Sequence, residues 1–560
     1  MKSSTTKHVI YQLMTRLFGN KVATNTKYGT LEENGVGKFN DITSAALMGI
    51  KELGVTHVWY TGVIEHALLT DYTRFGIPLD HPDVVKGRAG SPYAIKDYYD
   101  VNPDLAEDVP NRMNEFESLV SRTHEQGLKV IIDFVPNHVA RVYHSDVKPD
   151  DVDDLGEGDD PEVEFTTTNN FYYLQGQHFK TPQEVGAVRF EEFPAKATGN
   201  DQFSPSPSHN DWFETIKLNY GVDILNNRST HFYPIPSTWE KMRDILLYWT
   251  GKQVDGFRCD MAEMVPVEFW QWVIPQIKNV NTGILFIAEI YNPDVYTTHI
   301  HEGKFDFLYD KVGLYDALRS LTTGQGAVMD IVHIMSGRTD VNGYLLHFME
   351  NHDEQRIASS FFAHDAWKAI PAMVISATID KGPVMIYFGQ EVGETGSGEE
   401  GFSGEDGRTT MFDYWGVPAH QQWMNKGKFD GGSLTGEQKK LREFYSGLFE
   451  VASYSESILS GDYEDLTQGN QTVGSFSQRI HAYTRFTSRE LLVIVSSFND
   501  QPEKIRVTLP DHLMNHVKFL PGQPITASDL LKSGTSVSFN DENSFELDIP
   551  PFNSYIFKIK

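Results

Sequence analysis

The sequence predicts a (β/α)₈ barrel with an inserted subdomain after its third strand and a C-terminal antiparallel β-sandwich. Three observations support this prediction. Short apolar runs alternate with helical patterns to about residue 392, a long irregular stretch interrupts them, and alternating strand patterns follow. We therefore expect a barrel formed by residues 1–138 and 237–452, an inserted subdomain of residues 139–236, and a sandwich of residues 453–560.

Eight short apolar runs lie in the part predicted to form the barrel. Eight parallel strands favour a closed barrel over an open doubly wound sheet. The chain of 560 residues also exceeds what one hydrophobic core usually supports. The predicted strands are residues 8–13, 56–61, 129–134, 256–260, 285–289, 306–309, 345–349 and 384–388.

Helical periodicity is clear before the fourth predicted strand. Ser237 and Glu240 have the spacing of a capping box, and Gly251 predicts the end of this helix. A later helix, residues 436–452, leads into the C-terminal domain. The strands predicted there are residues 480–486, 491–495, 505–509, 545–549 and 555–559.

Composition excludes several classes of partner. The formal net charge is −29, whereas nucleic acid and anionic membranes are bound by clustered Lys and Arg. No segment has the ~20 consecutive apolar residues that a membrane span needs. A neutral substrate fits better. The single cysteine, Cys259, cannot form an intrachain disulfide and so indicates no compartment.

The first seven residues lack the apolar core of a signal peptide and run into the first predicted strand. As written, the sequence favours a cytoplasmic protein, or a secreted or periplasmic one whose leader has been removed. The sequence decides neither the compartment nor the oligomeric state.

Polar residues stand at the carboxyl ends of four predicted strands, the ends that face the active site in a (β/α)₈ barrel. Any single acid there is more often a helix cap or a turn residue, so the prediction depends on the whole set. The set is Asp133 and His138 at the third strand, Arg258 and Asp260 at the fourth, Glu289 at the fifth, and His352 and Asp353 at the seventh.

Asp260, Glu289 and Asp353 together have the groups that acetal hydrolysis needs. One carboxylic acid protonates the leaving oxygen, and one carboxylate captures the oxocarbenium-like centre. The acid must keep its proton near neutral pH, and crowding by other carboxylates raises a pKa in that direction.

Four segments in this order resemble the signature regions of the α-amylase family, glycoside hydrolase family 13. The resemblance covers nearly the whole chain, and it implies the (β/α)₈ barrel and retaining cleavage of α-1,4-glucosidic bonds in starch-type glucans or maltooligosaccharides. The segments are DFVPNH, GFRCD, IAEI and ENHDEQR.

The resemblance also implies roles for individual residues. Asp260 would be the nucleophile, Glu289 the general acid/base, and Asp353 the carboxylate that binds sugar hydroxyls and stabilises the transition state. Arg258 would orient Asp260. The expected sugar-binding residues are His138, His352 and Tyr93, with Asp133 as a structural acid; from its sequence alone, Tyr93 could equally be an ordinary interface aromatic.

Two segments depart from the commonest family pattern. Glu263-Met264 stands where many α-amylases have a Lys-His pair that binds glucan beyond the cleavage point. The segment Thr215-Ile-Lys217-Leu-Asn219 is similar to the form seen in neopullulanases and cyclomaltodextrinases. Branched and cyclic glucans therefore remain candidate substrates.

The resemblance requires no cofactor for the chemistry and leaves room for structural calcium. Asn137 matches a family side-chain calcium ligand, and oxygen donors suit such an ion. In the first loop, residues 34–41, Lys38 stands where an acidic ligand would be expected, and its ammonium could replace the ion.

Three alternatives remain open at this point. A transglycosylase would form the same covalent intermediate and pass it to a sugar. A non-catalytic glucan-binding protein would share the fold, since fold does not guarantee activity, although such proteins usually lose carboxylates. An unrelated (β/α)₈ enzyme would need all four segments by chance.

Overall fold

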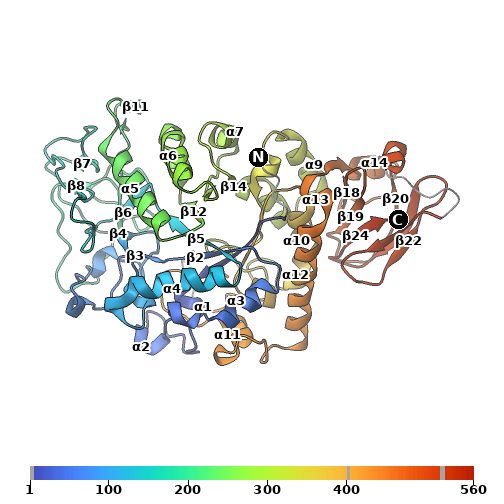
Figure 1. The fold of residues 1–560 in the computed structure, drawn as a ribbon, viewed down its shortest axis with the longest axis horizontal. Helices are drawn as coiled ribbons and strands as arrows, with labels where there is room; N and C mark the ends of the chain where they lie inside the picture. The colour runs from blue at the N-terminus through green and yellow to red at the C-terminus, as the bar shows by residue number, and fades with distance from the viewer. Residues whose placement is uncertain (1–5, 400–403, 517–523) are drawn as a thin grey trace.

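The computed structural model describes residues 6–399, 404–516 and 524–560, and its N-terminal part contains a parallel eight-stranded barrel (Figure 1). The strands follow the order β15-β14-β13-β12-β5-β2-β1-β16. A parallel bridge between His347 and Val384 joins the two outer strands and closes the sheet. The expected fold class is confirmed. Of the N-terminal residues considered for a leader, 1–5 lie outside the described ranges.

The barrel strands match the predicted apolar runs, with small shifts at their ends. They are β1 (Val9–Met14), β2 (His57–Thr61), β5 (Lys129–Phe134), β12 (Gly256–Cys259), β13 (Leu285–Ala288), β14 (Phe307–Tyr309), β15 (Leu345–Leu346) and β16 (Val384–Tyr387). The predicted seventh strand, 345–349, was too long. Beyond the His347 bridge the chain leaves the sheet, because buried Glu350 accepts a hydrogen bond from Ile357 N at 2.6 Å and pairs with Arg356 at 3.0 Å.

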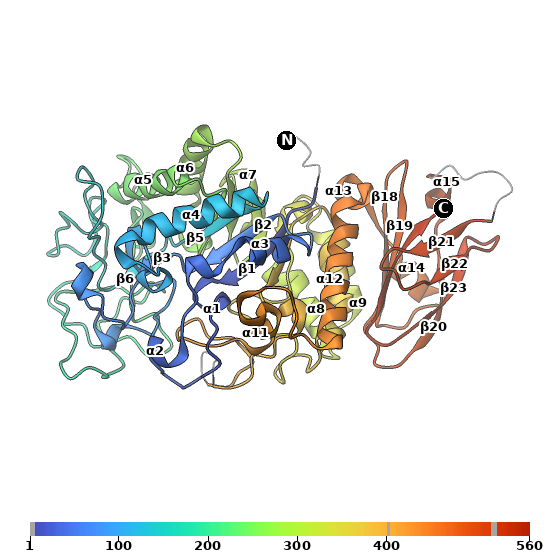
Figure 2. The ribbon, with the colours of Figure 1, turned by 60° about the horizontal axis from the view of Figure 1, so that its bottom comes forward.

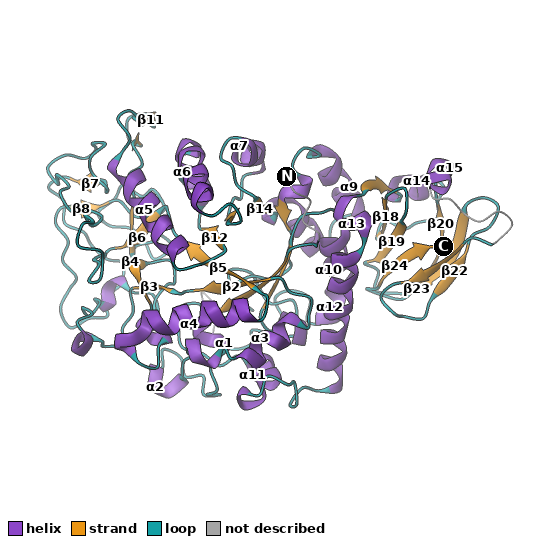
Figure 3. Ribbon diagram, in the orientation of Figure 1, coloured by secondary structure: helices purple, strands orange, loops and turns teal. Residues whose placement is uncertain are grey.

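Helices surround the barrel, and Trp59, Trp249 and Trp270 are among the largest fully buried side chains (Figure 3). The longer helices are α3 (Ser44–Lys51), α4 (Arg112–Glu125), α5 (Ser237–Gly251), α6 (Val267–Val280), α8 (Asp316–Thr322), α9 (Val328–Gly337), α10 (Ile370–Thr378), α11 (Pro418–Met424) and α12 (Gly436–Tyr454). The shorter ones are α1 (Thr15–Phe18), α2 (Leu31–Asn34), α7 (Tyr296–His301), α13 (Glu456–Ser460), α14 (Thr467–Thr472) and α15 (Asp511–His516).

The predicted capping box at the start of α5 was wrong. The N-cap residue is Pro236, and no side chain caps the helix. Ser237 lies one position later, and its hydroxyl donates to the Thr168 carbonyl at 3.0 Å. A contact with the inserted segment therefore uses the hydroxyl that local sequence spacing had assigned to the helix.

The segment of residues 139–236 forms only short strand pairs and loops, drawn at the left of Figure 3. The pairs are β6 (His138–Ala140) with β9 (Thr215–Lys217), β7 (Tyr173–Leu174) with β8 (Ala195–Lys196), and β10 (Val222–Asp223) with β11 (Ser229–Thr230). After β2, the antiparallel pair β3 (Ile64–His66) and β4 (Ile95–Val101) lies near β6 (Figure 1). The domain boundaries drawn from the sequence stay predictions.

The C-terminal part contains two antiparallel sheets that share a hydrophobic core, separated from the barrel strands by α12 (Figures 1 and 2). One sheet has the order β17-β18-β19-β24-β21-β22, and the other is the pair β20-β23. The strands are β17 (Asp462–Asp465), β18 (Ile480–Phe486), β19 (Leu491–Ser497), β20 (Glu503–Thr508), β21 (Thr526–Asp529), β22 (Ser536–Ser538), β23 (Ser544–Ile549) and β24 (Ser554–Ile559).

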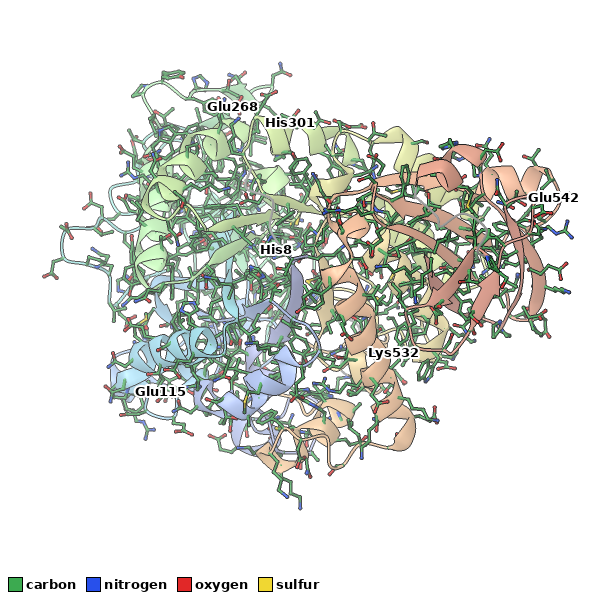
Figure 4. All side chains as sticks on the ribbon, turned by 45° about the vertical axis from the view of Figure 1, so that its right-hand side comes forward. His8, Glu115, Glu268, His301, Lys532 and Glu542 are labelled. Atoms are coloured by element: carbon green, nitrogen blue, oxygen red, sulfur yellow. The ribbon has the colours of Figure 1, made fainter. Side chains whose placement is uncertain are left out.

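Aromatic rings pack against one another at the amino ends of the barrel strands. His8, labelled in Figure 4, directly precedes β1, and its ring lies 4.9 Å from that of His57 and 5.5 Å from that of Phe307. In (β/α)₈ enzymes the carboxyl ends of the strands are the face that carries the chemistry. Within the described ranges, no helix has the length and apolar character needed to cross a bilayer.

Candidate active site

Arg258 on β12 is the centre of the charged cluster at the carboxyl ends of the strands. Its side chain is 1% exposed. Nη1 lies 2.7 Å from Asp260 Oδ1, and Nη2 lies 2.7 Å from Glu289 Oε1. Asp133 Oδ1 is 3.5 Å from Nη1. One guanidinium thus contacts carboxylates from β5 and from the residues that directly follow β12 and β13.

Three aromatic rings enclose this guanidinium. Its carbon lies 5.3 Å from the ring centres of Trp59 and Tyr93 and 5.4 Å from that of Tyr309. Arg258 Nε also donates to the Tyr309 hydroxyl at 3.2 Å. Rings stabilise a desolvated cation through their negative faces. Sequence reasoning missed Trp59 and Tyr309, although Tyr309 closes a predicted strand and the strand-end rule could have found it.

Glu289 is held by two hydrogen bonds in addition to Arg258. The Tyr291 hydroxyl donates to Oε1 at 2.8 Å, and the Met261 amide donates to Oε2 at 2.8 Å. Met261 has a φ of 43°, in the left-handed region that non-glycine residues rarely adopt. This strained turn directly after Asp260 aims a backbone donor at Glu289, which is the kind of position where strain is found at functional sites.

His352 connects Tyr93 to Asp353. Its Nδ1 accepts from the Gln12 amide at 2.8 Å, which leaves Nε2 to carry the proton. Nε2 lies 2.5 Å from the Tyr93 hydroxyl and 3.1 Å from Asp353 Oδ2. Burial and the nearby Arg258 hold the pKa of His352 well below its usual value, so the ring is neutral at physiological pH.

His138 lies beside Asp260. Its Nε2 is 4.0 Å from Asp260 Oδ2, and its Nδ1 is 3.1 Å from the Asn137 amide nitrogen. Burial lowers the pKa of His138 to about 3, assisted by the positive charges of Lys217 and Lys86. The structure therefore brings Tyr93, Asp133, His138, Arg258 and His352 together with the three predicted catalytic carboxylates.

Crowding of carboxylates around one cation shifts their protonation. Burial, together with the Glu289 charge, raises the pKa of Asp260 well above its usual value and that of Asp353 to about 7. Burial also raises the pKa of Asp133 to about 6, against the effect of Arg258. The raised pKa values of Asp260, Asp353 and Asp133 favour a proton that is retained near neutrality and shared among interacting acids.

The surroundings of Asn137 do not fit a calcium ion. Its side-chain oxygen accepts a hydrogen bond from the Lys217 ammonium, which also lies 2.8 Å from Asp201 Oδ1 and 3.3 Å from the Met264 carbonyl. An ammonium thus already supplies the positive charge at the oxygens that would hold the ion. In the first loop, the Lys38 ammonium donates to the Asp104 carbonyl at 2.6 Å. The described contacts leave calcium at Asn137 without support.

Barrel and site together define a class: (β/α)₈ proteins that gather several acids around one arginine at the carboxyl ends of the strands. The family model for the catalytic domain of α-amylase matches residues 24–424. That match covers well over half of the chain, and the protein belongs to the α-amylase family.

Individual relatives are distant. The chain is 21% identical over 426 residues to α-amylase 3 of Dictyoglomus thermophilum, covering 73% of this chain and 75% of the relative. It is 21% identical over 520 residues to neopullulanase 2 of Thermoactinomyces vulgaris, covering 90% and 71%. Among solved structures, the α-amylase of Geobacillus thermoleovorans complexed with acarbose matches with a TM-score of 0.61 at 18% identity, over 99% of this chain and 98% of that one. These structural likenesses support the fold alone.

Proposed function

We propose that the protein hydrolyses α-1,4-glucosidic bonds of starch-type glucans or maltooligosaccharides, with retention of anomeric configuration. The observation that carries the proposal is the pair of 2.7 Å contacts from one guanidinium to Asp260 and Glu289. Two carboxylates beside one another are what a covalent glycosyl-enzyme mechanism needs.

In this proposal Asp260 attacks the anomeric carbon while Glu289 protonates the leaving glycosidic oxygen. Glu289 then removes a proton from a water molecule, whose oxygen bonds to the anomeric carbon while the bond to Asp260 breaks and the sugar is released. Arg258 orients Asp260 and opposes the rise in its pKa, which favours the anionic form that attacks. Asp353 and the neutral His352 and His138 would bind sugar hydroxyls, and Tyr93 would cover the apolar face of the sugar ring.

A second candidate is a hydrolase of the neopullulanase or cyclomaltodextrinase type. The Thr215–Lys217 strand pairs with β6 next to His138, and Lys217 contacts the Met264 carbonyl. The departures at Lys217 and at Glu263-Met264 therefore lie side by side, where acceptor sugars would bind. A third candidate is a transglycosylase, which would form the same glycosyl-enzyme intermediate and transfer the glycosyl group to a sugar instead of water.

The roles of the two acids are tested by nearly isosteric substitutions. We expect Asp260→Asn and Glu289→Gln each to lower kcat on maltooligosaccharides by at least ~10⁴-fold, because each removes a group that bonds or transfers a proton in the reaction. Thermal unfolding should remain cooperative. Glu268→Gln, on the exposed start of α6 (labelled in Figure 4), is the matched control and should keep full activity.

Retention is tested by following the anomer of the released sugar by proton NMR. The α-anomer should appear first. Initial release of the β-anomer would contradict the roles given to Asp260 and Glu289, and their carboxyl separation of ~5–5.5 Å stays a prediction. Chromatography of products from starch, pullulan and cyclodextrin, with and without chelator, separates the three candidate activities.

A further inference from the structure

Outside the active site, three carboxylates meet where the β3–β4 pair reaches the inserted segment. Glu65 on β3 lies directly opposite Asp97 on β4 in the strand register. Asp146 comes from the inserted segment, and its backbone amide donates to Asp97 Oδ2 at 3.0 Å. One oxygen from each of the three carboxylates lies within 4.8 Å of the other two.

Glu65 is the unusual member of this cluster. The residue is 1% exposed, and neither carboxylate oxygen has a hydrogen-bond partner among the described residues. Asp97, by contrast, accepts at Oδ1 from the Tyr99 amide at 2.8 Å. Buried carboxylates are normally paired or bound to metal, so an unpartnered carboxylate beside two other acids needs an explanation.

The cations nearest to the Glu65 cluster pair with other acids. Lys96 Nζ lies 3.0 Å from Asp80 Oδ1, and Arg112 pairs with Asp100. Like charges placed directly opposite one another on paired strands are destabilising. The cluster is therefore costly unless a proton or a cation neutralises it.

The spacing fits a calcium ion. Calcium takes oxygen ligands at about 2.3–2.6 Å, so two ligands on opposite sides of one ion lie up to about 5 Å apart. Asp146 is exposed, so the cluster reaches the protein surface on that side. We propose that Glu65, Asp97 and Asp146 form a binding site for one calcium ion that joins the β3–β4 pair to the inserted segment.

Calcium at this site would also help to position Tyr93, a predicted sugar-binding residue. Tyr93 lies two residues before β4, and Glu65 lies four residues after β2. Fixing the β3–β4 pair therefore fixes the segment that carries the Tyr93 ring beside Arg258. This calcium site is distinct from the one expected at Asn137, where the Lys217 ammonium is bound.

The experiment compares calcium binding by the full chain and its variants after chelator treatment. Isothermal titration with calcium chloride should show a site in the wild-type protein that Glu65→Gln weakens at least about tenfold, because affinity depends on ligand charge. Calcium should raise the melting temperature of the wild type and not that of the variant. Glu443→Gln, an exposed acid on α12, is the matched control and should bind calcium as the wild type does.

The melting temperature without calcium shows whether the Glu65→Gln variant is folded. Without calcium, Glu65→Gln should melt at or above the wild-type temperature, because it removes a negative charge from an uncompensated cluster. When calcium is added, the wild type should instead have the higher melting temperature. Equal calcium binding by Glu65→Gln and wild type, no calcium binding by either, or tighter binding of magnesium than of calcium would each overturn the proposal.

Discussion

Two groups of neighbouring carboxylates in this protein differ in the positive charge that the chain places beside them. In the active site, Asp133, Asp260 and Glu289 face the Arg258 guanidinium. In the Glu65 cluster, three acids face one another, and Glu65 has no partner within the described ranges. The comparison teaches that a buried acid cluster needs neutralising charge, which Arg258 supplies in the active site and which calcium would supply at Glu65 under our proposal.

Lys217 is a second example of positive charge supplied by the chain. Its ammonium contacts Asn137 and Asp201, the oxygens that would otherwise suit a cation. The protein thus places an ammonium where the family resemblance led us to expect calcium. At Glu65 it leaves a carboxylate without a partner among the described residues, at a position where the sequence predicted no ion site.

The largest effect should come from removing the cation of the active site. Arg258→Leu makes this cluster resemble the Glu65 cluster without an ion, and breaking a buried ion pair costs about 3–5 kcal/mol. We expect urea denaturation to show a loss of that order, and kcat to fall at least ~10²–10³-fold because Asp260 and Glu289 lose their common contact. Arg258→Lys keeps the charge and should recover part of the stability. Wild-type stability in Arg258→Leu would refute the comparison.

A smaller loss is expected at Lys217. Lys217→Met keeps most of the side-chain volume and removes the ammonium between Asn137 and Asp201, so the free energy of unfolding should fall by about 3 kcal/mol. Lys196→Met is the control, since its ammonium is 3.7 Å from Glu192 and partly exposed. Chemical denaturation measures both variants. An equal, small effect in the two would show that Lys217 has no special structural role.

Asp353 should make the free energy of unfolding depend on pH. Its pKa is raised from 3.8 to about 7, so between these values the folded protein keeps a proton that the unfolded chain has released. Stability from this group is fully present below about pH 4 and is lost as the pH rises to 7, by at most about 1.4 kcal/mol per pH unit. Unfolding free energies of Asp353→Asn should therefore decline less steeply over this range than those of the wild type. Identical slopes would contradict the shifted pKa.

The smallest effect should follow Tyr291→Phe. This change removes the 2.8 Å hydrogen bond to Glu289 Oε1 while Arg258 and the Met261 amide remain. A hydrogen bond to a charged group contributes about 1.5 kcal/mol, which corresponds to about a tenfold lower kcat with little change in KM. Tyr454→Phe, on an exposed tyrosine, should leave both constants unchanged. A loss as large as that of Glu289→Gln would instead make Tyr291 essential to proton transfer.

Much of the fold and part of the site could be predicted from local patterns. Apolar runs located the barrel strands because each strand must bury its side chains on both faces. The strand-end rule led to Arg258, Asp260 and Glu289, which the structure brings into contact. The rule did not find Trp59, because this residue lies within strand β2. It did not find Tyr291 either, because this tyrosine lies two residues beyond Glu289. Ser237 failed because a distant carbonyl, that of Thr168, binds its hydroxyl.

By itself, the sequence determined which residues stand at the carboxyl ends of parallel strands, because alternation of strand and helix is a local property of the chain. Only the tertiary structure decided how the charges are neutralised. Glu65 and Asp97 are 32 positions apart, and Asn137 and Lys217 are 80 apart. Coulomb interactions act through space, so whether a buried acid meets an ammonium, a guanidinium or another acid depends on which distant segments the fold brings together.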